Sequence, residues 1–183
     1  MKRILLLCVL LTLGSIPCRA AETRPPSTTS LFEQHLGGEL INRAKQKKVT
    51  KDALDGKIVG IYFSAHWCPP CRAFTPKLVT AYKQIQKRHP NKFELVFVSL
   101  DRSEKAMFEY MKETQMPWLA VPFPVLKQLA PANTYQVQGI PTLLILDSKG
   151  TPITRNGRGD IQTKGAKAFD TWRTNANQPK QSN

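Results

Sequence analysis

The sequence predicts one α/β domain, built on a mixed central β-sheet with helices on both faces. Runs of β-branched and aromatic residues at 58–63, 93–100 and 143–146 have the length and composition of buried strands. Helical patterns separate these runs, and a turn at 147–150 opens a hairpin after the third. The order strand, helix, strand, helix, hairpin, helix predicts parallel strands at the centre of the sheet and antiparallel strands at one edge.

Three of the predicted helices follow from the spacing of apolar residues. Apolar side chains recur at roughly helical spacing over residues 31–41, with two glycines between them. A stronger pattern covers residues 72–87, where Pro76 is expected to kink the helix. A short helix at 124–129 is expected to end before Pro131.

Two more helices are predicted after the second strand and at the end of the domain. Asp101, with Glu104 three residues later, resembles a capping box that opens a helix. The methionines and aromatic residues at 107–111 are then expected to belong to the core. The last helix is predicted at residues 164–172.

Residues 1–20 are predicted to be a secretory signal peptide. Lys2 and Arg3 precede an apolar stretch, and Cys18 and Ala20 are the small residues that a cut after Ala20 requires. The apolar stretch is too short for a stable anchor, so no membrane span is expected after its removal. An uncleaved anchor, a buried helix and a lipoprotein are the alternatives. We therefore expect export, to a bacterial periplasm or cell envelope.

The remaining chain is predicted to contain a single domain. Residues 21–30 are rich in Pro, Ser and Thr and are interpreted as a linker. Residues 31–172 form the expected domain, residues 173–183 a disordered tail, and the protein is expected to be a monomer.

The chain is strongly basic, with a formal net charge of +14. Such a surface favours acidic partners or anionic lipid headgroups. Nucleic acid is not expected, because an exported protein rarely meets it. The basic run at residues 45–48 contains no aromatic residues and is interpreted as a solvated helix end.

The cysteines indicate chemistry rather than structural crosslinking. Removal of residues 1–20 leaves two of the four cysteines, Cys68 and Cys71. A disulfide framework normally has several cysteines that close long loops, whereas this pair closes almost nothing. Two thiols at the start of a helix supply an attacking thiolate and a second thiol that resolves the mixed disulfide. We assign Cys68 as the nucleophile and Cys71 as the resolving thiol.

Half of a zinc site is the alternative interpretation of this pair. Zinc requires four ligands, commonly a second cysteine pair or spaced histidines. The three histidines, His35, His66 and His89, form no such spaced pair. We therefore expect no metal and no cofactor beyond the redox-active disulfide.

Pro141 is a candidate for a cis peptide bond, because it directly precedes an apolar strand. Its ring would then cover the cysteine sulfurs. Ile140 would offer its backbone N–H and C=O groups to an extended substrate peptide. The alternative is that Pro141 merely starts the strand.

Three segments carry a resemblance to a known family. The run Tyr-Phe-Ser-Ala-His-Trp-Cys-Pro-Pro-Cys-Arg at 62–72 and the block Met-Pro-Trp-Leu-Ala-Val-Pro-Phe at 116–123 are similar to the tryparedoxin and nucleoredoxin branch of the thioredoxin superfamily. Gly-Ile-Pro-Thr at 139–142 matches the cis-proline loop of the wider superfamily. The resemblance covers residues 31–172 and implies a thioredoxin-like fold.

The resemblance also implies how substrate would be held. Trp67 would flank the nucleophile, and Ile140 and Pro141 would shape the groove for the substrate peptide. Pro69 is included with these three as an expected substrate-binding residue. Trp118 is expected to pack near the same groove.

Two positions depart from the family pattern. Ordinary thioredoxins have a buried aspartate where this chain has Tyr62, so the proton acceptor for Cys71 is left open among water, Tyr62 and another carboxylate. Pro131 falls in the helix that precedes the cis-proline loop and is expected to shorten or kink it.

The resemblance implies a thiol–disulfide oxidoreductase that acts on protein disulfides, mainly in the reducing direction. Its partners would be disulfide-containing proteins and an upstream electron donor. Two alternatives remain: a periplasmic disulfide oxidase or isomerase, and a redox-responsive binding protein without turnover. Members of the branch are typically intracellular, so the expected export signal would require a membrane donor or another periplasmic carrier.

Overall fold

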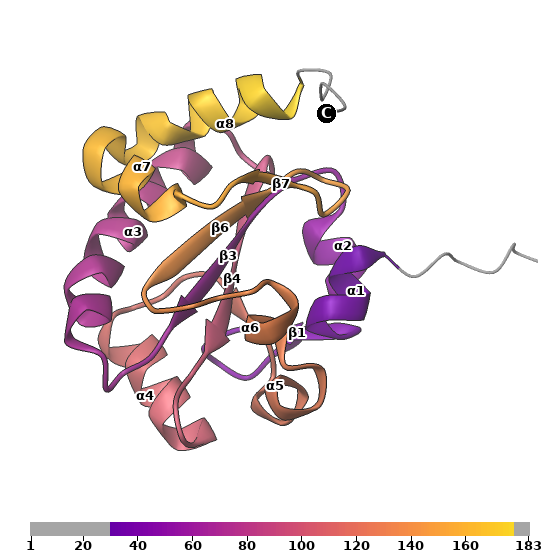
Figure 1. The fold of residues 1–183 in the computed structure, drawn as a ribbon, viewed down its shortest axis with the longest axis vertical. Coiled ribbons are helices and arrows are strands. Elements are labelled where there is room, and N and C mark those ends of the chain that lie inside the picture. Colours follow the sequence, from indigo (N-terminus) through magenta and orange to yellow (C-terminus); the bar gives the residue numbers. More distant parts are fainter. Residues whose placement is uncertain (1–29, 178–183) are drawn as a thin grey trace, which may run out of the picture.

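The computed structural model describes residues 30–177, in which the strands form one mixed sheet with helices on both faces (Figure 1). The strand order is β2-β1-β5-β4-β3-β6-β7. The strands are β1 (Glu39–Ile41), β2 (Lys47–Val49), β3 (Ile58–Ser64), β4 (Phe93–Ser99), β5 (Leu119–Ala120), β6 (Thr142–Leu146) and β7 (Pro152–Thr154). The helices are α1 (Leu31–Leu36), α2 (Thr50–Leu54), α3 (Pro69–Arg88), α4 (Glu104–Glu113), α5 (Phe123–Leu129), α6 (Pro131–Thr134), α7 (Gly157–Lys164), the 3-10 turn η1 (Gly165–Lys167) and α8 (Ala168–Ala176).

The centre of the sheet is parallel, as the sequence predicts. Strand β4 pairs in parallel with both β3 and β5. The pairs β3–β6 and β6–β7 are antiparallel, which confirms the predicted hairpin. Strand β1 is antiparallel to β5 and β2, so antiparallel strands lie at both edges instead of one.

The second antiparallel edge arises in residues 31–41, where the sequence suggested helical spacing interrupted by two glycines. Helix α1 ends at Gly37, whose φ of 86° favours glycine. Leu40 and Ile41 then lie in strand β1 with buried side chains. The basic run at residues 45–48 belongs to the β1–β2 hairpin rather than to a helix end, and its side chains are exposed.

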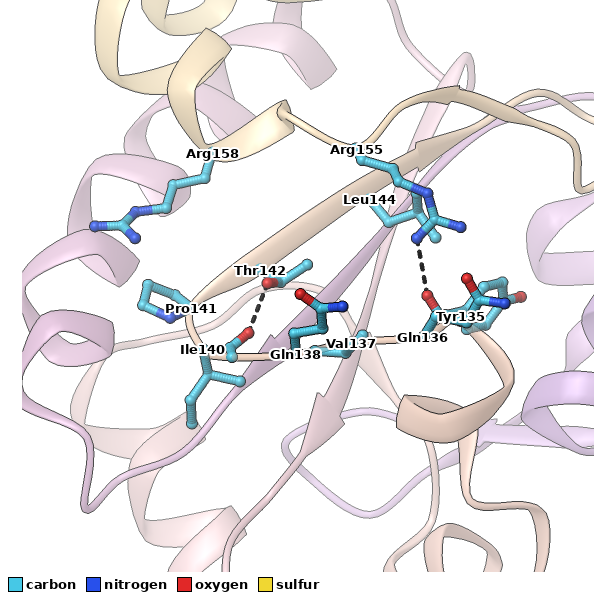
Figure 2. Close-up of a pocket in the computed structure, with 11 residues that line it drawn as sticks. Tyr135, Gln136, Val137, Gln138, Ile140, Pro141, Thr142, Leu144, Arg155 and Arg158 are labelled. Carbon is cyan, nitrogen blue, oxygen red and sulfur yellow. Dashed lines mark hydrogen bonds between the residues drawn. The ribbon is translucent and has the colours of Figure 1, made fainter.

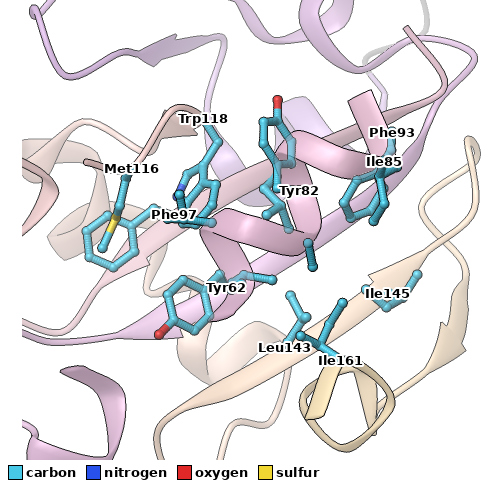
Figure 3. Packing of buried hydrophobic residues seen from close by; sticks show 14 of the residues in the cluster. Tyr62, Tyr82, Ile85, Phe93, Phe97, Met116, Trp118, Leu143, Ile145 and Ile161 are labelled. Carbon is cyan, nitrogen blue, oxygen red and sulfur yellow. The ribbon is translucent and has the colours of Figure 1, made fainter. Parts of the chain in front are cut away.

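Alternation along the strands sorts the core into two layers. In β3, Ile58 and Tyr62 face one layer, whereas Val59, Ile61 and Phe63 face the other. We call the first the aromatic layer; it is covered by α3, α4, α7 and α8 and contains the rings and aliphatic side chains seen in Figure 3. The second, the aliphatic layer, is covered by α1, α2, α5 and α6 on the opposite face of the sheet (Figure 1).

Helix boundaries differ from the sequence-based prediction at three places. Ser103, not Asp101, caps α4, and its hydroxyl accepts the N–H of Ala106. Helix α7 precedes the predicted last helix and was missed, because its residues show only weak apolar periodicity. Helix α8 continues to Ala176, past residue 172, where the domain was expected to end.

Other expectations agree with the structure. Helix α3 runs from Pro69 to Arg88 with Pro76 inside it. Met107, Tyr110 and Met111 are buried in the aromatic layer. Helix α5 ends at Leu129, and a separate short helix, α6, begins at Pro131.

Several predictions concern residues beyond the described range. The predicted signal peptide, nearly all of the predicted linker and the end of the predicted tail lie outside residues 30–177. Ser30, the last linker residue, caps α1 through a capping box with Glu33. Within the described range, no helix combines the length and apolar character needed to cross a membrane.

Candidate active site

The two cysteines lie at the start of the longest helix, directly after the central strand. Strand β3 ends at Ser64, and a short loop leads to Cys68, the N-cap residue of α3. Pro69 and Pro70 occupy the first helical positions, where a missing N–H costs little. Cys68 and Cys71 are joined by a disulfide. The N–H of Cys71 points at the Sγ of Cys68 over 3.3 Å.

The two sulfurs differ in their access to solvent. Cys68 is 4% exposed, whereas Cys71 is completely buried. Ala65, Leu100 and Ile140 pack around the pair with apolar atoms. An incoming substrate therefore reaches the first cysteine before the second.

The Ile140–Pro141 loop lies beside the cysteines. The peptide bond between these residues is cis, as the sequence suggested. The carbonyl oxygen of Ile140 lies 3.9 Å from the Sγ of Cys68. Figure 2 shows the loop on the wall of a hollow, with Ile140 and Pro141 at one end and Tyr135 at the other. The fold thus brings together two segments that are far apart in the sequence.

Trp67 is the large exposed residue of the site. Its side chain is 58% exposed, and its indole N–H donates to the carbonyl of Leu100 over 3.1 Å. Pro69 is also exposed at the helix start. Trp118, by contrast, is 1% exposed and lies in the aromatic layer, where its ring contacts Tyr62 and Tyr82. Trp118 is therefore a core residue and does not pack near the groove, contrary to the expectation from the sequence.

Asp101 organises the loop before the cysteines. Its Oδ1 accepts the backbone N–H of His66 over 2.8 Å, and its Oδ2 accepts the hydroxyl of Ser99 over 2.8 Å. The His66 ring stacks on Tyr110 and lies 2.8 Å from the Oε2 of Glu113. Sequence analysis missed this role because it assigned Asp101 to a helix cap. The signal available was weak: a carboxylate immediately after a buried strand, next to the edge where the cysteines lie.

A network of buried hydroxyl groups lies beneath the cysteine helix. Thr75 lies 2.7 Å from the Tyr62 hydroxyl and 2.5 Å from the Tyr110 hydroxyl, and it donates to the Cys71 carbonyl over 2.9 Å. The Tyr110 hydroxyl also contacts Ser64 over 3.0 Å. Burial, with Tyr110 nearby, raises the pKa of Tyr62 far above its ordinary value of 10.0.

This shift removes one of the three candidates for the proton acceptor of Cys71. A phenol whose pKa is raised remains protonated at neutral pH and cannot accept a proton as phenolate. No carboxylate in residues 30–177 is hydrogen-bonded to either cysteine. Apolar atoms of Ala65, Leu100 and Ile140 pack against the pair, so water and a carboxylate from elsewhere stay open as acceptors.

Metal binding finds little support in the described part of the chain. No group of three or more potential ligands among histidine, cysteine, aspartate and glutamate occurs there. The absence of metal and cofactor remains a prediction.

A disulfide at a helix N-terminus, beside a cis-proline loop on a sheet with a parallel centre, defines a protein of the thioredoxin fold. The thioredoxin-like family model matches residues 56–151. The chain therefore belongs to the thioredoxin-like family. This confirms the resemblance and the predicted fold.

Sequence comparison places the chain near the nucleoredoxins. It is 47% identical to a nucleoredoxin of Danio rerio over 131 residues, which are 71% of this chain and 30% of that protein. It is 48% identical to probable nucleoredoxin 1 of Arabidopsis thaliana over 122 residues, 67% of this chain and 21% of that protein. The chain thus spans less than a third of the length of these relatives.

Solved structures of single-domain size match more of their own length. Tryparedoxin I from Leishmania major has a TM-score of 0.66 and 35% identity, over 76% of this chain and 95% of that one. Thioredoxin from Wuchereria bancrofti has a TM-score of 0.63 and 40% identity, over 74% of this chain and 94% of that one. The tryparedoxin match, together with the nucleoredoxin relatives, supports the tryparedoxin and nucleoredoxin branch, and the thioredoxin match supports the superfamily.

The comparisons correct the expected location. The similar nucleoredoxins come from animals and plants, so the expected bacterial periplasm or cell envelope is wrong. That expectation rested on the form of residues 1–20, which lie outside the described range. A basic start followed by a short apolar stretch does not distinguish a bacterial protein from a eukaryotic one.

Proposed function

We propose that the protein is a thiol–disulfide oxidoreductase that reduces disulfides in partner proteins. One observation supports this most directly: the Cys68–Cys71 disulfide lies at the N-terminus of α3, beside the Ile140 carbonyl. Relatives named thioredoxin, tryparedoxin and nucleoredoxin support the same chemistry and favour the reducing direction.

In the reduced protein, the helix would stabilise a thiolate on Cys68. A helix N-terminus carries a partial positive charge of about half an elementary charge. The N–H of Cys71 already points at the Cys68 sulfur. Sulfurs in such positions have a pKa of about 3.5–7.5 instead of about 8.5. Cys68 is therefore the nucleophile of this proposal.

The reaction then runs in two exchanges. The Cys68 thiolate attacks one sulfur of the substrate disulfide, and the other substrate sulfur leaves as a thiolate that takes a proton from solvent. Cys71 loses its proton to solvent and attacks the Sγ of Cys68. The substrate leaves with its second thiol, and the Cys68–Cys71 disulfide remains. Two electrons have passed to the substrate, and a thiol donor must return them.

The substrate would dock as an extended peptide along the Ile140–Pro141 loop. The Ile140 N–H has no hydrogen-bond acceptor within residues 30–177, and its carbonyl faces Cys68. A peptide strand that pairs with these groups would place its cysteine over the nucleophile. Trp67 and Pro69 are exposed on the other side of Cys68 and would complete the groove with Pro141.

Cysteine variants test the proposal. Wild-type protein should reduce insulin with dithiothreitol as donor, whereas Cys68→Ser should lose this activity completely. Cys71→Ser should accumulate mixed disulfides through Cys68, because no resolving thiol remains. Cys68→Ser/Cys71→Ser serves as the matched control and should trap nothing. All variants are compared by circular dichroism to confirm folding.

Two outcomes would contradict the proposal. A folded wild-type protein without any thiol exchange would exclude the enzyme. A reduction potential near about −120 mV, instead of near about −270 mV, would assign the protein to the oxidising class.

A further inference from the structure

We propose that the protein selects partners whose reactive cysteine is flanked by acidic residues on both sides. This inference rests on the proposed function and concerns its substrate class. Four arginines, which we call the basic rim, line two hollows, one beside the Ile140–Pro141 loop and one beside Trp67: Arg72, Arg102, Arg155 and Arg158.

The two hollows are lined by different neighbours of Cys68. One is lined by the Ile140–Pro141 loop together with Arg155 and Arg158, which approach it from the end of β7 and the start of α7 (Figure 2). The other is lined by Trp67 together with Arg72 and Arg102. Cys68 directly follows Trp67 and contacts Ile140, so it lies between them.

The guanidinium groups of the basic rim form no ion pair with an acidic side chain of residues 30–177. Arg155 donates only to a carbonyl, that of Tyr135, over 2.9 Å. The Nε of Arg158 is buried and has no hydrogen-bond partner in the described chain. Anion-binding capacity is therefore left on both sides of the cysteine.

Three carboxylates lie near the basic rim, and each is hydrogen-bonded to a group other than an arginine. Asp101 is held by the His66 N–H and the Ser99 hydroxyl. Glu113 lies against the His66 ring, 2.8 Å from its Nε2. Asp160, in the first turn of α7, accepts the indole N–H of Trp172 over 2.9 Å. These hydrogen bonds leave the carboxylates charged, but the four arginines outnumber Asp101, the one carboxylate among the residues that line the two hollows.

The positions of these arginines oppose the helix dipoles. Arg158 lies in the first turn of α7, Arg72 follows Cys71 near the start of α3, and Arg102 directly precedes the N-cap of α4. Helix N-termini favour anions, so a cation there is unfavourable. The first turn of α3 contains no acidic residue. An anionic partner would relieve this repulsion at α3, whereas Glu104 and Asp160 already place a negative charge in the first turns of α4 and α7.

The geometry favours a protein segment over a small anion. A single carboxylate can occupy one hollow, whereas an extended chain docked along Ile140 passes Cys68 and reaches both. Acidic residues before and after the substrate cysteine would then meet one arginine pair each. Charge complementarity of this kind raises the association rate and is weakened by salt.

Two matched peptide disulfides test the inference. In the acidic peptide each cysteine is flanked by Asp and Glu; in the neutral peptide Asn and Gln replace them. Second-order rate constants for reduction by the pre-reduced full chain are measured at about 0.05 M and about 0.5 M salt. We expect the acidic peptide to react about tenfold faster at low salt, and the ratio to approach one at high salt.

Charge-matched variants locate the effect. Arg102→Gln/Arg158→Gln removes one arginine from each hollow and should lower the acidic-to-neutral ratio at least about threefold. Lys77→Gln/Lys83→Gln removes the same charge from exposed positions on α3 and should keep the ratio of the wild type. Equal rates for both peptides at low salt, or an equal loss in both variants, would overturn the inference. Failure to reduce either peptide would instead overturn the proposed function.

Discussion

The two layers of the core differ in side-chain type, and each supports a different half of the site. Aromatic rings are concentrated in the aromatic layer, where Trp118 meets Tyr62 and Tyr82 at centroid distances of 6.2 and 5.5 Å. Valine, leucine and isoleucine dominate the aliphatic layer. The aromatic layer holds α3 with its cysteines, whereas the aliphatic layer holds the segment that leads to Ile140.

The site forms where the two layers meet at the carboxyl end of β3. Cys68 and Cys71 form a small apolar cluster of their own with Ala65, against which Leu100 and Ile140 pack. The difference between the layers therefore teaches that the cysteines and the loop facing them are positioned by separate packing. A substitution in one layer should therefore disturb either the cysteines or the loop at Ile140 more than the other.

The largest effect is expected from removal of the central ring of the aromatic layer. Trp118→Ala should lower the free energy of unfolding by about 3–5 kcal/mol, because it leaves a large cavity among Tyr62 and Tyr82. Urea unfolding followed by circular dichroism measures the loss. A loss below about 1 kcal/mol would show that the neighbouring side chains move in and fill the cavity.

Two neighbouring leucines of β6 compare the layers directly. Leu143 lies in the aromatic layer and Leu144 in the aliphatic layer, and both are buried. Leu143→Ala and Leu144→Ala should each lower the free energy of unfolding by about 2–5 kcal/mol. Only Leu144→Ala should also slow disulfide reduction at a temperature where both are folded, because Leu144 lines the hollow beside Ile140. Equal reduction rates would contradict the separate support of the site.

Gly60 tests how tightly the aromatic layer is packed. A Cβ at this position would lie 2.4 Å from a Leu95 methyl group and 3.3 Å from Phe93. Gly60→Ala should therefore lower the free energy of unfolding by about 1–3 kcal/mol, because the added methyl group overpacks the layer. Gly56→Ala is not a suitable control because its φ is 68°, whereas Gly38→Ala meets open space. A chemical denaturation series that gives both alanine variants wild-type stability would refute the tight packing.

The smallest effect is a change in pH dependence. Burial raises the pKa of Glu94 above 4.5, although the Tyr82 hydroxyl and Lys57 partly oppose the shift. The native state then binds the proton more tightly than the unfolded chain, so stability falls as pH rises from the ordinary glutamate range through the raised native pKa. Glu94→Gln should lack this decline. Parallel stability curves for the two proteins between pH 4 and 8 would contradict it.

Much of this protein followed from local patterns in the chain. The apolar runs at 58–63, 93–100 and 143–146 predicted the central strands, because a strand that is buried on both faces needs apolar residues at successive positions. The cysteine pair after the first run predicted a disulfide at a helix start, since two prolines suit the first helical turn. These features depend on neighbours within a few residues.

Contacts between distant segments were decided only in the folded chain. Apolar spacing could not tell that Leu40 and Ile41 form strand β1, because a short apolar pattern fits a helix or a strand. The pairing of β1 with β5 selects the strand. Asp101 accepts the N–H of His66, 35 positions away, and the basic rim assembles from three helix ends and the residue that follows β7. Such arrangements depend on how the sheet brings its ends together, which no local pattern records.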